Sequence, residues 1–425
     1  MNDICCPLRS DRITFFFRKH IHSIASLSVL VFVFFIPFPQ LTAIEEISFY
    51  LSLLAFAAYL IFQKKIDILD TPANLPFFLF TIWCIFGLFF AINFKNSLHD
   101  IYAHLIKYIL FCYILFYFFR SQKRMNLLTN TIISSSVIFA LGLMFHYYFI
   151  LGVKFNAKLG LTSYIEMPTN IIGTVTVFGI FLSIMPFKEN KTLIMKVLSG
   201  LGMLVLTIAT LATQTRGSIL ALFVGLIVIV LLKINKRAIL IVILVLVFFL
   251  PFMSLRTVLT PKALYNKIAM ENRWNIWYSF AKMTTDYPLI GIGFGMQSYY
   301  DESLLNKYNS RIPPEYRQKI PHKAPHNLIV DVAVRTGVVG LLLFGYLILT
   351  FIRIAWRLAK LGKNSFVKEL SIISLASLAA IIIQGLTENT LSGPPALIMY
   401  TIFAIMMILW KLNEEIKPTS DLIQK

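Results

Sequence analysis

Long apolar runs without a single charged residue set the first limit on what this chain can fold into. The stretches from Ile24 to Phe38 and from Ala238 to Phe252 each cover most of a bilayer's thickness, since about 20 apolar residues span the hydrocarbon core. Charged residues make up only 14% of the 425 residues, whereas roughly a quarter of a typical soluble domain is charged. The chain is therefore predicted to be an all-α, polytopic integral membrane protein.

Hydropathy and chain-breaking residues divide the chain into about 12 predicted transmembrane helices, with one long polar loop between spans nine and ten. The predicted organisation is a cytoplasmic tail at 1–21, spans one to nine within 22–254, a periplasmic loop at 255–327, spans ten to twelve within 328–411 and a cytoplasmic tail at 412–425. The spans are expected at roughly 22–38, 44–62, 73–92, 101–119, 127–150, 168–187, 193–213, 217–233, 237–254, 328–352, 366–386 and 391–411.

The positive charge of the chain predicts its orientation in the membrane. Of 39 Lys and Arg residues, 23 fall in the seven tails and loops on the side of the N-terminus, and four fall in the five short loops on the other side. Basic residues concentrate in short cytoplasmic loops of membrane proteins, so both termini are predicted to be cytoplasmic. This pattern also explains the net charge of +19 without a nucleic-acid partner, and none is expected.

The long loop at 255–327 is the only predicted extramembrane segment large enough to carry a folded element, and loops of this length are usually functional or disordered. Its tryptophans and tyrosines argue for order. The stretch from Trp274 to Met283 is amphipathic and could lie on the membrane surface as a helix. The external side of the membrane, opposite the termini, is therefore where we expect the chemistry.

Arg216 is the first candidate residue, because it lies in the polar turn Thr213–Ser218 at the predicted outer end of two spans. The next helix starts at Gly217, and unpaired N–H groups at a helix start favour an anion. A guanidinium can add two parallel hydrogen bonds to a phosphate. The structural alternative is an arginine that reaches the lipid head groups.

Arg273 and His326 are candidates in the predicted periplasmic loop. Arg273 precedes Trp274 in an aromatic stretch typical of membrane interfaces, and it could instead simply pair with Glu271. His326 lies just before span ten, where a neutral imidazole is a plausible proton acceptor near neutral pH. His322 lies four residues earlier and could suggest a metal pair with it. No external Cys or carboxylate completes a recognisable ligand set, so no metal is expected.

Two further patterns favour a structural role. Asp331 and Arg335 lie one helical turn apart and can pair, with a possible second effect of orienting His326. Gly291, Gly293 and Gly295 look like a nucleotide-binding pattern, but no strand–helix unit accompanies them. They predict a turn whose backbone approaches the membrane surface or a ligand.

Taken together, these motifs resemble the O-antigen ligase family, whose members join a lipid-linked polysaccharide to the lipid A core. The resemblance is carried by the Thr-Arg-Gly turn of Arg216, by Arg273-Trp274 with the glycine-rich stretch after it, and by His326-Asn327 followed after nine residues by Gly337-x-x-Gly340. It is best between 206 and 343, while the first six spans match in hydropathy alone. Glu388 falls where relatives often carry polar residues.

The resemblance implies a glycosyl transfer without metal, ATP or another cofactor, at the periplasmic face of the bacterial inner membrane. The donor would be an undecaprenyl-diphosphate-linked glycan and the acceptor a lipid A core sugar, with inversion at the anomeric carbon. Arg216 and Arg273 would bind the diphosphate and stabilise its developing charge, and His326 would accept the proton of the acceptor hydroxyl. The remaining substrate-binding candidates are Trp274, Asn327, Gly337, Gly340 and Glu388.

Rival functions remain open at this point. O-antigen polymerases and protein O-oligosaccharyltransferases share the external arginines and much of the topology, and the acceptor alone distinguishes them from a ligase. The spacing of His326 to the two glycines favours a ligase. A lipid or anion transporter is the alternative from another class, but the sequence has neither the paired repeats nor the broken helices that such proteins usually show.

Overall fold

The computed structural model of the protein describes residues 9–62, 70–155, 157–160, 168–188, 192–233, 273–314, 317, 321 and 323–416. The elements in these ranges are helices, with no strand among them, which confirms the all-α, polytopic fold class. Nine of the described helices are long and apolar enough to cross a membrane, and two shorter apolar helices cover His20–Phe35 and Asn74–Phe90. The predicted span at 237–254 lies outside the described residues.

The membrane bundle is built from α1 (Arg9–Phe35), α2 (Thr42–Phe62), α3 (Asn74–Phe86), α4 (Phe94–Asp100), α5 (Lys107–Phe118), α6 (Gln122–Phe145), α7 (Thr169–Leu182), α8 (Met185–Lys188), α9 (Leu193–Ala212), α10 (Arg216–Lys233), α15 (Leu328–Leu361), α16 (Ser365–Gly385) and α17 (Gly393–Glu415). Short 3₁₀ turns η1 (Pro39–Leu41) and η3 (Gly87–Phe90) and π-helical turns η4 (Ile101–Ile106) and η5 (His146–Ile150) complete it. Because η4 joins α4 to α5, the fourth span begins at Phe94, earlier than the predicted residue 101.

α16 and α17 form the centre of the bundle, and α9 lies at its edge. α16 packs along α10, α15, α17 and α7. In α17 83% of the most apolar window is buried, against 28% in α9. The exposed side chains of α9 are apolar, including Leu193, Ile194 and Leu198. Such a surface requires lipid as its solvent, because water would have to cover a large contiguous apolar patch.

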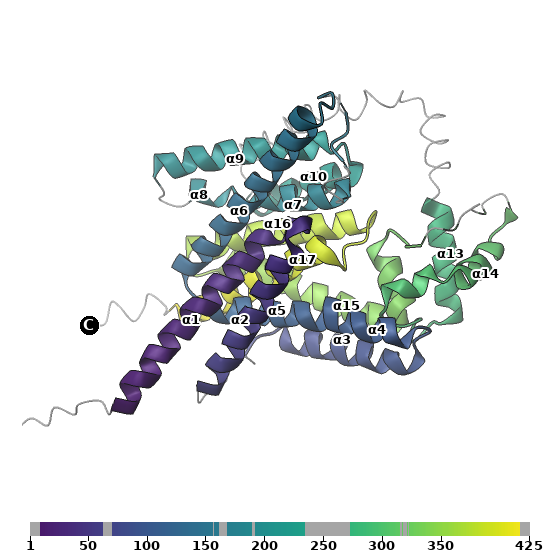
Figure 1. Ribbon diagram of the computed structural model, residues 1–425, viewed down its shortest axis with the longest axis horizontal. Helices are drawn as coiled ribbons and strands as arrows, with labels where there is room; N and C mark the ends of the chain where they lie inside the picture. Colours follow the sequence, from purple (N-terminus) through teal and green to yellow (C-terminus); the bar gives the residue numbers. More distant parts are fainter. Residues whose placement is uncertain are drawn as a thin grey trace, which may run out of the picture.

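The described ends of the chain lie on the same face of the bundle. α1 and α2 pack together as consecutive helices, so the start of α1 and the end of α2 share a face. Asp70 follows α2, and its carboxylate lies 3.0 Å from the ammonium of Lys411 near the end of α17. Figure 1 shows α13 and α14 at the opposite end of the molecule from the start of α1.

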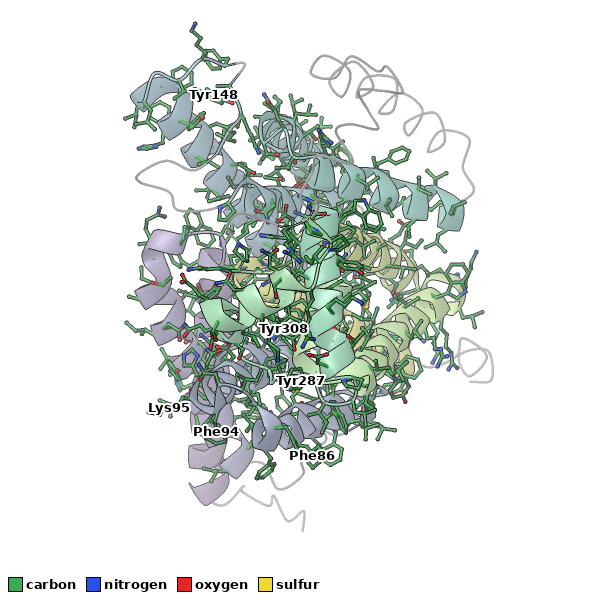
Figure 2. All side chains as sticks on the ribbon, turned by 90° about the vertical axis from the view of Figure 1, so that its right-hand side faces the viewer. Phe86, Phe94, Lys95, Tyr148, Tyr287 and Tyr308 are labelled. Atoms are coloured by element: carbon green, nitrogen blue, oxygen red, sulfur yellow. The ribbon has the colours of Figure 1, made fainter. Side chains whose placement is uncertain are left out.

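A cap of short helices covers that opposite end. It comprises residues 273–314, with α13 (Arg273–Asp286), η6 (Met296–Tyr300) and α14 (Glu302–Ser310). Viewed from this side, Tyr287 and Tyr308 of the cap lie near the middle of the face and Tyr148 lies at its edge (Figure 2). In the predicted orientation this is the periplasmic face.

The cap has a small apolar core of its own, which changes the expected role of α13. The predicted helix is present, but Ile276, Phe280 and Met283 pack against Tyr299 and Tyr308 and onto Val334 of α15 rather than onto lipid. These three positions follow helical spacing and so lie on one face. The amphipathic pattern therefore records packing within the cap and not a helix lying with its apolar face on the membrane.

A break in α15 attaches the cap to the bundle. Gly337 has a φ of 69°, a left-handed conformation that favours glycine. The break frees the carbonyl oxygens of Val334 and Arg335, which accept hydrogen bonds from the N–H groups of Ile292 at 2.9 Å and Gly293 at 3.1 Å. The glycine-rich stretch 291–295 thus brings its backbone close to α15.

Candidate active site

The loop of residues 386–392 between α16 and α17, here the Glu388 loop, is where the predicted site residues meet. One carboxylate oxygen of Glu388 lies 3.4 Å from a terminal nitrogen of Arg273, and the other lies 3.5 Å from Nδ1 of His326. Glu388 is half-buried, while Arg273 and His326 are 37% and 41% exposed. The three groups form a row of cation, carboxylate and imidazole that solvent can reach.

Arg273 starts α13 and is fixed to the Glu388 loop by two contacts. Besides the contact with Glu388, its guanidinium donates a hydrogen bond of 3.0 Å to the carbonyl oxygen of Thr387. Glu271, which was considered as its partner, lies outside the described residues. A guanidinium has five N–H groups, so these contacts leave Arg273 with further donors for an anionic ligand.

His326 and Asn327 connect the cap side of the chain to the start of α15. His326 has a φ of 46°, which is uncommon outside glycine and, when it occurs, is often found at functional sites. The side-chain oxygen of Asn327 accepts from the N–H groups of Ile329 and Val330, and its NH₂ group donates to the carbonyl of Leu386 at 3.0 Å. Asn327 therefore caps α15 and ties it to the Glu388 loop, which gives it a structural role.

The start of α10, where Arg216 lies, contacts the same loop. A Cβ placed on Gly217 would lie 2.8 Å from the hydroxyl oxygen of Thr387, so the first turn of α10 contacts the Glu388 loop. The preceding turn is stabilised by hydroxyl groups: Thr213 donates to the carbonyl of Thr210 at 2.6 Å, and Thr215 donates to Ser218 at 2.8 Å. The N-terminal end of α10 thus faces the site, where helix N–H groups favour an anion.

Trp274 and the two glycines of the motif have different surroundings. Trp274 is 62% exposed and contacts Trp277 edge to face. A Cβ on Gly337 would lie 2.0 Å from the carbonyl oxygen of Leu289, and a Cβ on Gly340 would lie 2.2 Å from the hydroxyl oxygen of Thr336. Both glycines allow close packing, which gives each a structural reason to lack a side chain.

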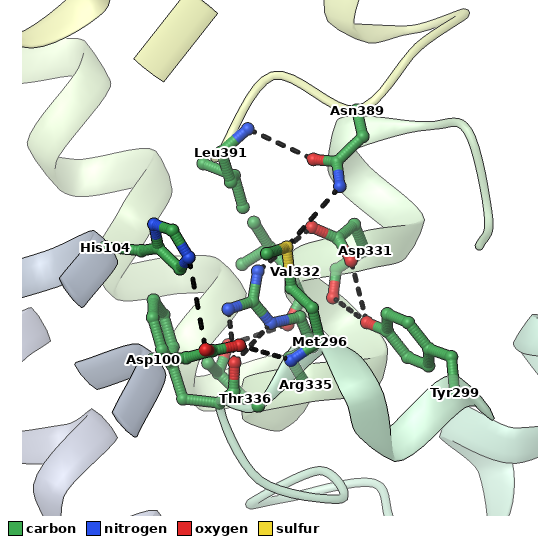
Figure 3. Close-up of polar contacts among 12 residues, drawn as sticks. Asp100, His104, Met296, Tyr299, Asp331, Val332, Arg335, Thr336, Asn389 and Leu391 are labelled. Carbon is green, nitrogen blue, oxygen red and sulfur yellow. Dashed lines mark hydrogen bonds and ion pairs between the residues drawn. The ribbon is translucent and has the colours of Figure 1, made fainter. Parts of the chain in front are cut away.

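Asp331 and Arg335 pair as predicted, and their further contacts described here are with the cap. Arg335 is 1% exposed, lies 3.2 Å from the Asp331 carboxylate and also donates to the carbonyl oxygen of Phe294 at 2.7 Å. Asp331 accepts a second hydrogen bond, of 2.7 Å, from the hydroxyl of Tyr299 (Figure 3). Burial, followed by the charge of Asp331, raises the pKa of Tyr299 well above its usual value and keeps this donor protonated. The carboxylate beside His326 is Glu388.

Polar residues of α4 and η4 hold the cap from the other side. Successive N–H groups of residues 295–297 donate to Ser97 at 3.1 Å, to Asp100 at 2.7 Å and to Asn96 at 2.8 Å. Asp100 also contacts His104 at 4.0 Å (Figure 3). These residues bind backbone of the cap and do not touch the Glu388 row in the described contacts.

Sequence reasoning missed Thr387. Its carbonyl accepts from Arg273, 114 positions earlier in the chain, and its hydroxyl lies beside the start of α10. No local pattern signals this role, because both contacts depend on how distant helices pack. In the described part of the chain no group of three His, Cys, Asp or Glu residues could hold a metal ion, and His322 lies outside that part.

Comparison with known protein families identifies the part of the chain that carries most of these residues. Residues 201–345 match the family described as O-antigen ligase. The chain carries an O-antigen ligase domain. This domain contains seven of the eight predicted site residues, namely all except Glu388, which lies beyond its matched end. The chain is thus a multi-pass membrane protein in which residues 201–345, the O-antigen ligase domain, supply the motifs. The loop after this region supplies the carboxylate between Arg273 and His326.

The N-terminal part of the chain matches a second family. Residues 27–144, which run from α1 to α6, match a family of unknown function, DUF5935. No curated protein matches the chain. The polar residues Asn96, Ser97 and Asp100 belong to this N-terminal part, so the contacts between α4 and the cap join the two matched regions.

Proposed function

We propose that the protein is an O-antigen ligase that transfers a glycan from undecaprenyl diphosphate to a lipid A core sugar at the periplasmic face of the bacterial inner membrane. The observation that carries the proposal is the row formed by Arg273, Glu388 and His326. In this row a guanidinium and an imidazole flank one carboxylate at the end of the bundle away from the described termini. This arrangement supports the proposed roles of Arg273 as phosphate-binding cation and His326 as proton acceptor.

The reaction would form one bond and break one. The acceptor hydroxyl oxygen bonds to the anomeric carbon, the bond from that carbon to the diphosphate oxygen breaks, and its electron pair stays on the diphosphate. Attack from the face opposite the diphosphate inverts the anomeric configuration. The glycosyl diphosphate is already activated, so the proposal needs neither ATP nor a metal.

In this proposal Arg216 and Arg273 bind the diphosphate. Both begin helices that contact the Glu388 loop, Arg273 through the carbonyl of Thr387 and α10 through Gly217. Preorganised donors stabilise the negative charge that develops on the leaving group, and one such donor contributes about 3 kcal/mol in known enzymes. The N–H groups at the start of α10 add to this field.

His326 would accept the proton of the acceptor hydroxyl, and Glu388 would stabilise the positive charge that the imidazole gains. General-base catalysis contributes roughly 10²- to 10⁴-fold in rate. A distance of 3.5 Å between Nδ1 and Glu388 is longer than a hydrogen bond, which is common in enzymes without substrate and shortens in the reacting complex. Glu388 is thus proposed as a positioning residue.

Lipopolysaccharide banding tests the proposal. The gene is deleted, and the strain is complemented with wild type, His326→Ala or His99→Ala at matched expression. His99 is the control, since its side chain is 69% exposed at the same end of the bundle. We expect core-lipid bands alone and accumulated lipid-linked polymer in the deletion strain, with the ladder restored by wild type and His99→Ala but not by His326→Ala.

Other outcomes identify the rival functions. Bands that carry a single repeat unit would make the protein a polymerase. Loss of glycan from a protein, with an unchanged lipopolysaccharide ladder, would make it an oligosaccharyltransferase. An unchanged ladder together with altered passage of a labelled lipid in proteoliposomes would favour a transporter.

A further inference from the structure

The outward face of α13 carries a stripe of exposed side chains that folding does not require. Trp274, Tyr278, Ala281 and Thr285 are exposed, and their spacing puts them on one face of the helix. We call this face the α13 stripe. Tyr278 is 44% exposed, so the stripe leaves two large aromatic rings in contact with solvent.

The opposite face of α13 is the one that holds the helix in the cap. Ile276, Phe280 and Met283 are buried in the apolar core of the cap. Aromatic rings are large apolar surfaces, and exposed apolar surface that serves no packing role often marks a binding site. The stripe therefore suits a ligand that packs one apolar face on the aromatic rings and exposes polar groups to water.

The position of the stripe relates it to the proposed reaction centre. It begins at the residue after Arg273, whose guanidinium contacts Glu388 and Thr387. It continues along α13 for about 16 Å, at 1.5 Å of rise per residue. In Figure 1, α13 lies across the end of the bundle rather than parallel to its helices. A chain that leaves the diphosphate site can therefore follow the stripe along the face of the protein.

Charge at the edge of the stripe is positive. The ammonium of Lys282 lies 5.3 Å from the centre of the Tyr278 ring, next to the aromatic surface. Over residues 273–325 the sequence has seven Lys or Arg and four Asp or Glu residues. Lys282 is a hydrogen-bond donor for hydroxyl, carboxylate or phosphate groups, which suits a glycan that carries polar or acidic substituents.

We infer that the α13 stripe is a glycan subsite that binds the first sugars of the lipid-linked donor. The inference rests on the proposed function, since it takes Arg273 as the anchor of the donor diphosphate. The sugar nearest the diphosphate lies at the reaction centre, and the next sugars stack their C–H faces on Trp274 and Tyr278. Lys282 binds their polar groups. The stripe thus orients the donor glycan as it leaves the membrane surface.

Steady-state kinetics of the purified full-length protein in nanodiscs test this subsite. The probes are undecaprenyl diphosphate carrying a defined oligosaccharide and a lipid A core acceptor, each varied at saturating levels of the other. Trp274→Ala and Tyr278→Ala should each raise the KM for the donor about three- to tenfold, as expected for loss of one aromatic contact. The KM for the acceptor should not change.

Matched variants separate stacking from general damage. Trp274→Phe and Tyr278→Phe retain an aromatic ring and should recover most of the donor affinity. Tyr300→Ala in η6 and Trp356→Ala in α15 remove equally exposed aromatic rings and should leave both KM values unchanged. A larger KM for the acceptor in the stripe variants would overturn the inference in favour of an acceptor subsite. Unchanged KM values would also overturn the inference and would mean that the stripe contacts only lipid head groups or solvent.

Direct binding keeps the inference separate from the proposed function. The free oligosaccharide released from the donor is titrated calorimetrically into wild type and into the Trp274→Ala, Tyr278→Ala double variant. Binding by wild type that weakens at least tenfold in the double variant supports the subsite, even if no ligase turnover is observed. Turnover by wild type with equal oligosaccharide binding by both proteins overturns the subsite and leaves the proposed function standing.

Discussion

Two arginine–carboxylate pairs lie at the same end of this protein and differ in burial. Arg335 and Asp331 are each 1% exposed, and both have further partners, the Phe294 carbonyl and the Tyr299 hydroxyl. Arg273 and Glu388 are partly exposed, and their contact is longer, at 3.4 Å. The Arg335–Asp331 pair is buried beneath the cap, whereas the Arg273–Glu388 pair is accessible to solvent.

The difference separates a structural arginine from one that can bind a ligand. A buried charge needs every hydrogen-bonding group satisfied, because an unpaired charge in a low-dielectric interior is very unfavourable. A guanidinium that binds substrate must instead keep donors accessible and exchange its partner for the ligand. Both arginines lie in the predicted motif region, so burial, and not sequence position, distinguishes them.

The largest expected effect is on stability and concerns the buried pair. Arg335→Ala leaves the Asp331 carboxylate buried without its cation, and breaking such a pair costs about 3–5 kcal/mol. We expect a markedly lower midpoint of thermal unfolding in detergent and loss of the monodisperse peak. The double variant Asp331→Leu, Arg335→Met should recover part of the loss. A stable Arg335→Ala protein that lacks only activity would remove the distinction between the two pairs.

The next effect is on catalysis and concerns the accessible arginines. Arg216→Lys keeps the charge but loses the planar fork that binds phosphate through two hydrogen bonds. A loss of about 3 kcal/mol in transition-state stabilisation corresponds to a fall on the order of 100-fold in kcat/KM. The unfolding midpoint should stay within a degree or two of wild type, roughly the scatter expected for a surface change. Arg317→Lys, an exposed arginine that donates to backbone carbonyls, is the control, and full activity of Arg216→Lys would exclude the diphosphate role.

Much of the fold, but less of the site, could be predicted from sequence. Lipid requires each span to be apolar over its whole length, so hydropathy locates the bundle helices. The pairing of Asp331 with Arg335 follows from local helical spacing. The partner of His326 could not be predicted in this way, because Glu388 reaches it from a loop 62 positions later in the chain.

A smaller catalytic effect would sharpen the role of the accessible carboxylate. Glu388→Gln keeps the size of the side chain but removes the charge that faces both Arg273 and His326. A hydrogen bond to a charged group contributes about 1.5–3 kcal/mol, so kcat should fall at least tenfold while the protein folds normally. Asn389→Ala, one residue away, is the control for disturbance of the loop. Equal kcat values for Glu388→Gln and wild type would remove Glu388 from the site.

The smallest expected effect concerns a third, exposed pair in the cap. The hydroxyl of Tyr308 and then the guanidinium of Arg311 lower the pKa of Asp286 below its usual value. The folded state therefore binds this proton less readily than the unfolded state, so the stabilisation is present at neutral pH. This stabilisation begins to be lost as the pH falls below about 4, the ordinary pKa of an aspartate in the unfolded chain. The loss is complete once the pH has fallen through the lowered pKa of the folded state.

Tryptophan fluorescence of the cap measures this loss. We expect a small acid-induced change below about pH 4 in wild type, which Asp286→Asn should reduce. Asp301 titrates in the same window, because hydrogen bonds from Ser303 and Leu304 lower its pKa as well. Asp301→Asn therefore measures the part of the acid-induced fluorescence change that comes from Asp301. An acid transition of equal size in wild type and in Asp286→Asn would show that the exposed pair contributes nothing to the cap.

The break at Gly337 also determines which parts of this protein can be exchanged with a relative. Val338 donates its N–H to the carbonyl of Pro288 at 2.8 Å, while the carbonyls of Val334 and Arg335 accept from the glycine-rich stretch. The glycine-rich stretch and the start of α15 satisfy each other's main-chain hydrogen-bonding groups, so neither can be transferred without the other. A chimera that brings in a foreign cap must include the first turns of α15 with it, and evolution can vary the two only together.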